Sequence, residues 1–264
     1  MVNSHRGPNA RHQVQESNPL RVMPITGHLE ELRRRLMWAG GSTLAAGFSL
    51  AIFWKQLLQG ILWPWSWAHL PSPQGLSHPA LLTLSPTEPF FTVVNVVLTV
   101  ALLVTSPVWV YELWMYLAPI LPPVHRRWVG FALMTGLLLF WIGVAFTFAI
   151  LIPASLRFLM TFAASVFTES LRAGPYLSFV TTFSLAFGAL FTVPAWLGIA
   201  VKIGWLRVEQ LRRGRRIALF ASAVLAAAIV PSQDPLTLLA AILPVYGLYE
   251  VTIQLSRWIR PLEH

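Results

Sequence analysis

The sequence GHLEELRRRL, residues 27–36, stands directly before the first long apolar run, which extends from Met37 to about Trp54. Thr26 is suited to the start of a helix, and Glu30 and Glu31 lie in the first turn, where the helix dipole favours negative charge. Three arginines follow before the apolar run begins. We therefore expect one helix that begins in water and continues into lipid.

The charges of this stretch have two interpretations. Glu30 with Arg34 and Glu31 with Arg35 are spaced i,i+4, and such pairs on an exposed helix contribute only about 0.2–0.5 kcal/mol each. In that case the arginines mainly fix the topology of membrane insertion. The other interpretation gives the carboxylates a binding function, and it depends on motifs that lie later in the chain.

The composition indicates an integral membrane protein. Apolar residues make up 56% of the 264 residues, charged residues only 11%, and the mean hydropathy is +0.63. The chain has no cysteine, which excludes disulfides, thiol catalysis and cysteine metal sites. The formal charge of +9 belongs to the loops of a membrane protein and does not indicate nucleic-acid binding.

Six apolar runs predict an all-α fold of six transmembrane helices. We place the spans at about residues 37–54, 89–116, 128–153, 176–201, 217–230 and 236–256. They form one membrane domain, residues 24–260. A disordered cytoplasmic tail, residues 1–23, precedes this domain, and a short tail, residues 261–264, follows it.

Several spans depart from a straight helix of standard length. The second span is too long to cross upright, so it should tilt, and Pro107 should kink it. Pro194 and Pro244 lie within the fourth and sixth spans. The fifth run has only fourteen residues, which at 1.5 Å each falls well short of a core of roughly 30 Å. We therefore expect spans five and six to form a short hairpin.

Two long connections are predicted on the outer side. Residues 55–88 should form a loop in which Trp63, Trp65 and Trp67 lie at the level of the lipid headgroups. A second outer loop should occupy residues 154–175. The orientation follows from the basic residues, because sixteen of the nineteen Lys and Arg lie before span one, after span six or in the other two connections. The positive-inside rule then places both termini in the cytoplasm.

Five motifs in order resemble the TatC family, the polytopic core of the twin-arginine protein translocase. The first is His28–Leu36. The others are Ser85–Phe91, Ala118-Pro119 through Arg126-Arg127, Tyr176–Phe179 with Ala186–Gly188 and Val193-Pro194, and finally Pro231, Asp234, Pro235, Pro244 and Leu248–Glu250. The resemblance covers roughly residues 24–260.

The resemblance implies a receptor without cofactors that is not an enzyme. Members of the family fold as tilted, kinked helices that form a concave, glove-like wall. They bind the Arg-Arg motif of folded precursors at the cytoplasmic face of the inner membrane. They assemble with TatA and TatB, single-span proteins, and with further copies of themselves, and transport is driven by the protonmotive force. The implied surroundings are the lipid bilayer and protein partners, with no nucleic acid.

The resemblance also implies a signal-peptide site. Glu31 matches the family's glutamate in the first motif, and Arg33 beside it is a structural or peptide-contacting residue. The second family glutamate stands just before Arg126 and Arg127, where this chain has His125. Guanidinium groups are best held by carboxylates, whereas a neutral histidine accepts one hydrogen bond and supplies no negative charge.

Glu112 is a possible substitute for the missing carboxylate. It stands where the family usually has glutamine, near the cytoplasmic end of the second span. Two interpretations remain open for it. Either it moves the peptide anchor along the helix, or it is an interfacial glutamate that faces water or a neighbouring arginine.

A partner-binding set is carried over from the same family. Thr192 replaces a family glutamate in span four, beside Pro194, and can hydrogen-bond across helices without ionising. Thr237 and Leu238 stand where a Ser-Gln pair is usual. Glu250 lies in an apolar helix, where an acidic group is by default a functional candidate, although snorkelling toward the cytoplasmic end is the plain alternative. Structural roles fall to Glu88, Pro107, Pro231, Asp234, Pro235 and Pro244.

Two other functional classes are weaker. A proton-coupled transporter of small solutes would also have kinked spans and a few carboxylates, but no internal repeat is found. A membrane-embedded enzyme would need a catalytic set, and the sequence has neither HExxH nor G-x-S-x-G. None of the seven histidines lies inside a predicted span, so no metal site is expected.

Overall fold

A computed structural model of the chain describes residues 25–68, 81–162, 172–229 and 235–258. Within these ranges the structure is helical apart from short connections and one isolated parallel bridge between Leu82 and Arg172. The predictions for the two tails, for residues 69–80 and 163–171 of the outer connections, and for Pro231 and Asp234 lie outside the described residues. The described helices agree with the predicted all-α fold class.

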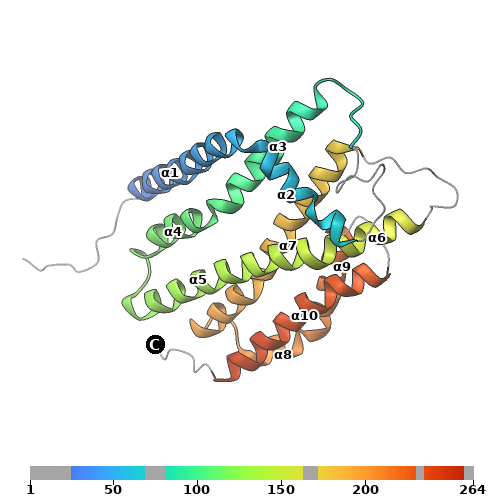
Figure 1. Cartoon of the computed structure of the whole chain (residues 1–264). Helices are drawn as coiled ribbons and strands as arrows, with labels where there is room; N and C mark the ends of the chain where they lie inside the picture. Colours follow the sequence, from blue (N-terminus) through green and yellow to red (C-terminus); the bar gives the residue numbers. More distant parts are fainter. Residues whose placement is uncertain (1–24, 69–80, 163–171, 230–234, 259–264) are drawn as a thin grey trace, which may run out of the picture.

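Figure 1 shows the arrangement of the described helices. They are α1 Ile25–Ile52, α2 Trp54–Trp67, α3 Glu88–Val104, α4 Ser106–Leu117, α5 Pro123–Phe146, the π-helix η2 Thr147–Leu151, α6 Ile152–Phe162, α7 Ala173–Lys202, α8 Val208–Arg213, α9 Arg215–Ile229 and α10 Pro235–Trp258.

The segment after α1 is a helix, so its prediction as a loop was wrong. α2 follows α1 after a single residue and is turned from it by 89°. Ile61 and Trp65 bury their side chains in the main core. Arg157 of α6 donates hydrogen bonds to the carbonyl oxygens of Trp67 and Ala68 at 3.0 and 2.8 Å. These bonds satisfy carbonyls that a helix end leaves without partners, so tertiary contacts stabilise α2.

The predicted kink in the second span is confirmed as a break between two helices. α3 ends at Val104, α4 begins at Ser106, and the two are bent by 51°. Pro107 lies in the first turn of α4, where its missing N–H leaves no helical hydrogen bond unmade. Thr105 lies between the helices, and its hydroxyl donates to the Ala101 carbonyl oxygen at 2.8 Å.

The third span extends beyond the predicted end at Pro153. Helix runs from Pro123 to Phe162, so the first part of the predicted second outer loop is helical. The π-helix at Thr147–Leu151 comes just before Pro153. A proline lacks the N–H for the helical ladder and crowds the carbonyl four residues earlier, and a wider π turn accommodates it. The helix therefore passes the proline without ending.

The other predicted proline interruptions do not break their helices. Pro194 lies inside α7 and Pro244 inside α10, and both helices are continuous. Pro235, expected at the start of the sixth span, is the first residue of α10.

The number of membrane crossings is compatible with the prediction of six. By length and apolar composition, the α5–α6 unit, α7 and α10 can each cross a membrane, and counting each bent pair, α1–α2 and α3–α4, as one span gives five within the described residues. α9 has 15 residues, or about 22 Å of helix. It is as short as expected for the fifth span.

The helices alternate in direction. In Figure 1 the start of α1, the α4–α5 connection and the end of α10 lie toward one end of the molecule, and the starts of α3, α7 and α10 lie toward the other. The main core lies around α7, where Phe183 and Phe187 are almost completely buried. This scaffold holds α1 and α4 side by side at the first end.

Candidate functional site

Three charged side chains form a cluster between α1 and α4. Arg35 donates to Glu31 Oε1 from Nη2 at 2.7 Å and from Nε at 3.1 Å, and to Glu112 Oε2 from Nη1 at 3.1 Å. Glu31 and Arg35 lie one turn apart on α1, whereas Glu112 comes from α4. The side chains are 16–18% exposed. We call these three residues the carboxylate cluster; in it one guanidinium is held by two carboxylates.

Neighbouring contacts fix α4 against α1. The rings of His28 and Tyr116 stack with centroids 4.5 Å apart. Further along, Trp109 Nε1 donates to Thr43 Oγ1 at 3.0 Å, and that oxygen lies 2.9 Å from Thr105 Oγ1. Polar groups at this helix contact are therefore paired on both sides of the cluster, which sets the register of Glu112 against Glu31.

Glu31 also borders an open cavity of about 760 Å³ on α1. Its lining includes Glu30, Arg33 and Arg34, which are exposed. The predicted peptide-contacting residue Arg33 thus shares a solvent-filled surface with Glu31 but is not part of the carboxylate cluster.

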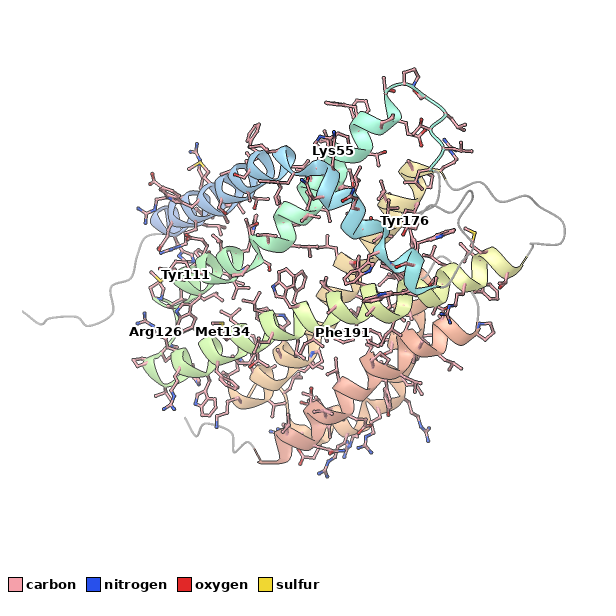
Figure 2. The ribbon with its side chains drawn as sticks, in the orientation of Figure 1. Lys55, Tyr111, Arg126, Met134, Tyr176 and Phe191 are labelled. Atoms are coloured by element: carbon pink, nitrogen blue, oxygen red, sulfur yellow. The ribbon has the colours of Figure 1, made fainter. Side chains whose placement is uncertain are left out.

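The remaining predicted peptide residues lie at the start of α5. His125, Arg126 and Arg127 are in its first turn, and the Arg126 guanidinium carbon lies 6.0 Å from the centre of the Trp114 ring of α4. Figure 2 shows Arg126 and Tyr111 at the same end of the molecule, away from Lys55 and Tyr176. Glu31, Glu112 and the basic start of α5 are therefore placed at one end by three different helices.

The sequence interpretation missed the role of Arg35 as the link between the carboxylates. It noted the i,i+4 pair with Glu31 and, for Glu112, a neighbouring arginine as one alternative. The sequence did contain a signal for this link: Glu112 replaces a neutral residue of the family, and the added negative charge needs a positively charged partner. The identity of that partner, Arg35, depends on the bend at Thr105, which turns α4 onto α1.

Comparison with known proteins establishes the family. Residues 27–244 match the family described as Sec-independent protein translocase protein (TatC). The chain belongs to the TatC family. The TatC protein of Deinococcus radiodurans is 33% identical over 239 residues, covering 90% of this chain and 87% of that protein. That of Aquifex aeolicus is also 33% identical over 239 residues, covering 89% of this chain and 95% of that protein.

Solved structures agree with this assignment. Two crystal structures of the twin-arginine translocase receptor TatC, one of them in DDM, match with TM-scores of 0.71 and 0.72 at 31% identity. They cover 88% and 87% of this chain, and this chain covers 99% of each. The chain is thus a multi-pass membrane protein of the translocase, which works with other Tat components and is not an enzyme. The small-solute transporter interpretation is not favoured.

The predicted partner-binding residues are not brought together in this TatC fold. Thr192 lines an apolar cavity of about 260 Å³ between α4, α5 and α7, which we call the α4–α7 cavity. Pro194, two residues on, faces a different groove beside α10. Thr237 is fully buried at the start of α10, and Leu238 packs against the main core.

Glu250 is bonded within the chain. Its carboxylate accepts a hydrogen bond from Arg215 Nη2 and another from the Tyr246 hydroxyl, both at 2.8 Å. The neighbouring Tyr249 hydroxyl donates to the Leu211 carbonyl oxygen at 2.7 Å. These contacts join α10 to α8 and α9, so the geometry gives Glu250 a clear role in holding the last helices together.

Glu88 is bonded at the first residue of α3. Its Oε2 accepts a hydrogen bond from the Leu84 backbone at 2.9 Å and lies 3.8 Å from Arg172. The Ala173 backbone donates to the Leu82 carbonyl oxygen at 3.0 Å. A Cβ at Gly174 would lie 2.9 Å from Glu88 Oε1. The starts of α3 and α7 are thus tied together at the end opposite the carboxylate cluster.

Metal binding finds no support in the part of the chain that the structure describes. There, no three His, Asp or Glu side chains group closely enough to hold a metal ion.

Proposed function

We propose that this chain is the receptor of a twin-arginine translocase and binds the Arg-Arg signal peptides of folded precursors at the cytoplasmic face of the inner membrane. The observation that carries the proposal is the carboxylate cluster, in which Glu31 and Glu112 already accommodate a guanidinium. Two carboxylates that converge on one guanidinium offer the recognition chemistry that arginine peptides require.

The cluster retains capacity for further arginines. Arg35 uses Oε1 of Glu31 and Oε2 of Glu112, and a carboxylate can accept several hydrogen bonds on its two oxygens. We assign the second oxygen of each carboxylate to the peptide, with Glu112 in the role that His125 cannot fill. The partial exposure of the cluster gives a peptide side chain access without the full cost of burying a charge.

The surrounding residues complete the site in this proposal. Arg33 contacts the peptide along the open cavity on α1, and His125, Arg126 and Arg127 contact it from the start of α5. Their common position at one end of the molecule supports this arrangement.

Partner helices of the TatA and TatB type are proposed to dock at the α4–α7 cavity. Thr192 borders it, and Ser106 contributes a buried hydroxyl that has no hydrogen-bond partner among the described residues. An interhelical hydrogen bond to such groups contributes about 0.6–2 kcal/mol in lipid. Pro194, Thr237, Leu238 and Glu250 remain predicted partner contacts, and the intramolecular bonds of Glu250 make it the least accessible of them.

The proposed topology has six spans with both termini in the cytoplasm. It is supported by the charge asymmetry of the connections and by the location of the α1 start and the α10 end on the same side of the molecule. Export through the assembled translocase would then use the protonmotive force, as the family resemblance implies. Self-association of the receptor belongs to the same proposal.

The test is photocrosslinking of a signal peptide bearing Arg-Arg, and of its Lys-Lys twin, to the receptor in membranes. We expect selective labelling by the Arg-Arg peptide, with affinity at least tenfold lower in Glu31→Gln and in Glu112→Gln, since a hydrogen bond to a charged group contributes about 1.5–3 kcal/mol. Glu30→Gln is the matched control, because Glu30 lies one residue from Glu31 outside the cluster.

Two outcomes would contradict the proposal. Equal labelling by the two peptides would show that the site does not recognise arginine. Unchanged affinity in Glu112→Gln with a loss in Glu31→Gln would show that Glu112 does not replace the missing carboxylate.

A further inference from the structure

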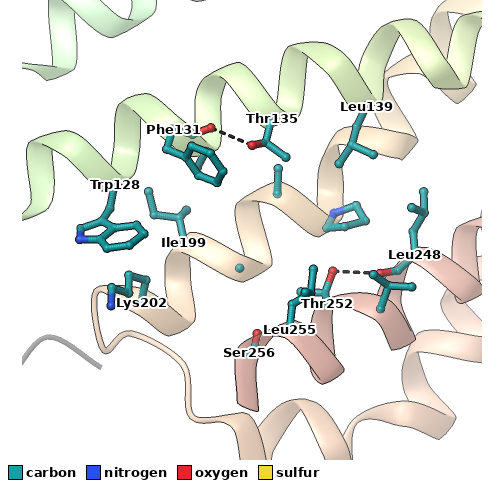
Figure 3. A pocket seen from close by; sticks show the side chains of 15 residues that line it. Trp128, Phe131, Thr135, Leu139, Ile199, Lys202, Leu248, Thr252, Leu255 and Ser256 are labelled. Atoms are coloured by element: carbon teal, nitrogen blue, oxygen red, sulfur yellow. Dashed lines mark hydrogen bonds between the residues drawn. The ribbon is translucent and has the colours of Figure 1, made fainter. Parts of the chain in front are cut away.

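α5, α7 and α10 enclose an apolar groove of about 260 Å³, which we call the α5–α10 groove (Figure 3). Small residues form part of its lining, namely Ala132, Ala195 and Gly198. Exposed large apolar side chains, among them Phe131 and Leu255, border it. Because these apolar side chains are exposed, the groove lies at the surface of the helix bundle.

One end of the groove is polar. The Lys202 ammonium lies 4.3 Å from the centre of the Trp128 ring. Ser256 is 1% exposed, and its hydroxyl has no hydrogen-bond partner among the described residues. Figure 3 shows these three residues toward one end of the groove, with Leu139 and Leu248 toward the other. By contrast, the Thr135 and Thr252 hydroxyls at mid-length bond to their own helices, to Phe131 and Leu248.

We propose that the α5–α10 groove binds an anionic phospholipid, with an acyl chain along the groove and the phosphate beside Lys202 and Ser256. A lysine next to a tryptophan is typical of the headgroup level, where the aliphatic stem lies in lipid and the ammonium reaches the interface. Basic pockets between membrane helices bind phosphate headgroups. The Ser256 hydroxyl gains the partner it lacks by donating to a phosphate or ester oxygen.

The polar end of the groove favours a lipid over a partner helix. A phosphate beside Lys202 supplies an acceptor for the buried Ser256 hydroxyl, whereas the apolar face of a helix supplies none. The proposal uses no residue of the carboxylate cluster and stands independently of peptide recognition.

The test uses protein in nanodiscs of equimolar phosphatidylglycerol and phosphatidylcholine with identical acyl chains, with retained lipids identified by native mass spectrometry after release. We expect the wild type to retain phosphatidylglycerol about fivefold over phosphatidylcholine, the selectivity expected from one lysine at the surface. Lys202→Gln should abolish this preference, and Lys202→Arg should keep it.

Gly198→Leu tests the apolar part of the groove. A Cβ at Gly198 meets no atom within 4 Å, so the leucine side chain enters open space and should reduce retention of both lipids severalfold. Gly247→Leu is the matched control, because Gly247 is also unobstructed and is not among the groove residues. Lys55→Gln is the control for charge, since the Lys55 ammonium lies 5.7 Å from the Trp54 ring centre outside the groove.

Three results would overturn the proposal. The first is a Lys202→Gln protein that still prefers phosphatidylglycerol. The second is an equal loss of preference in Lys55→Gln, which would indicate a general charge effect. The third is unchanged lipid retention in Gly198→Leu with a loss of dimers in the same spectra, which would assign the groove to a second copy of the chain.

Discussion

The α5–α7 and α1–α4 helix pairs are held together by opposite means. α5 and α7 approach closely through glycine: a Cβ at Gly143 would lie 2.8 Å from Phe191 and 2.9 Å from the Phe187 carbonyl oxygen. A Cβ at Gly188 would lie 2.8 Å from Val144. Small residues at such contacts let membrane helices pack by van der Waals attraction alone. This contact is apolar and leaves no room for movement.

The α1–α4 contact consists of polar bonds between partly exposed side chains. The carboxylate cluster, the His28–Tyr116 stack and the Thr43–Trp109 hydrogen bond join the two helices. Polar bonds can be exchanged for equivalent bonds to another molecule, whereas the steric fit of two helices cannot. The comparison indicates a fixed scaffold at α5–α7 and an exchangeable contact at α1–α4, where the peptide is proposed to bind.

The largest effect is expected from breaking the scaffold contact. In Gly143→Ala the new methyl meets the Phe187 backbone and the first atoms of the Phe191 side chain, which cannot turn away. We expect the free energy of unfolding to fall by about 2 kcal/mol or more, the cost of overpacking. Chemical denaturation in detergent, followed by circular dichroism, measures it.

Gly40→Ala is the control for this substitution. A Cβ at Gly40 meets no atom within 4 Å, so the change should be neutral or raise helix stability by up to about 1 kcal/mol. Equal losses in the two variants would show that the α5–α7 contact has no special rigidity.

A smaller effect is expected from removing the bridge at the exchangeable contact. Arg35→Gln leaves Glu31 and Glu112 facing each other without their shared cation. Because the cluster is partly exposed, we expect the free energy of unfolding to fall by about 1 kcal/mol, near the lower end of the cost of leaving a buried polar group without a partner. Distances between spin labels on α1 and α4 should broaden, and an Arg-Arg peptide should narrow them again.

Arg34→Gln is the matched control for Arg35→Gln, since Arg34 is exposed on the same helix outside the cluster. If Arg34→Gln broadens the α1–α4 distances as much as Arg35→Gln does, the cluster does not join the helices.

The smallest effect is expected at Thr43. Thr43→Val keeps the shape of the side chain but removes the acceptor of Trp109 and the partner of Thr105. Interhelical hydrogen bonds in membranes contribute about 0.6 kcal/mol on average, so we expect the free energy of unfolding to fall by that amount. A double-mutant cycle with Trp109→Phe measures the coupling directly.

Ser49→Ala provides the comparison for Thr43. The Ser49 hydroxyl bonds only to Ala45 of its own helix, so its removal should leave unfolding unchanged. A coupling energy of zero between Thr43 and Trp109 would indicate that this bond does not contribute to the helix contact.

Local signals in the sequence were sufficient for most of the helices. The apolar runs located them, Pro107 located the break in the second span, and the fourteen-residue run predicted a short fifth helix, which the 15 residues of α9 confirm. The family motifs predicted Glu31 as a candidate site residue. These features depend on neighbouring residues, and a sequence shows them directly.

The features that were missed depend on distant residues. α2 has Pro64 and four tryptophans, a composition typical of a loop, and its helix is stabilised by the contacts of Trp65 in the core and by Arg157. Pro153 predicted a helix end, but the π turn before it lets the helix continue. Arg35 joined the candidate site only because a 51° bend brings Glu112 to it.

The break at Thr105 also has a mechanical consequence. α3, on one side of it, is packed on the α7 scaffold and anchored through Glu88 at its start, whereas α4, on the other side, contacts α1 through exchangeable bonds. Glu112 lies seven residues beyond Thr105, which at 1.5 Å per residue is a lever of about 10 Å. A rotation of about 10° there moves the Glu112 backbone by roughly 2 Å, enough to break a 3.1 Å hydrogen bond to Arg35. The proposed capture of an arginine at one end of this lever is thereby coupled to the angle at the middle of the span.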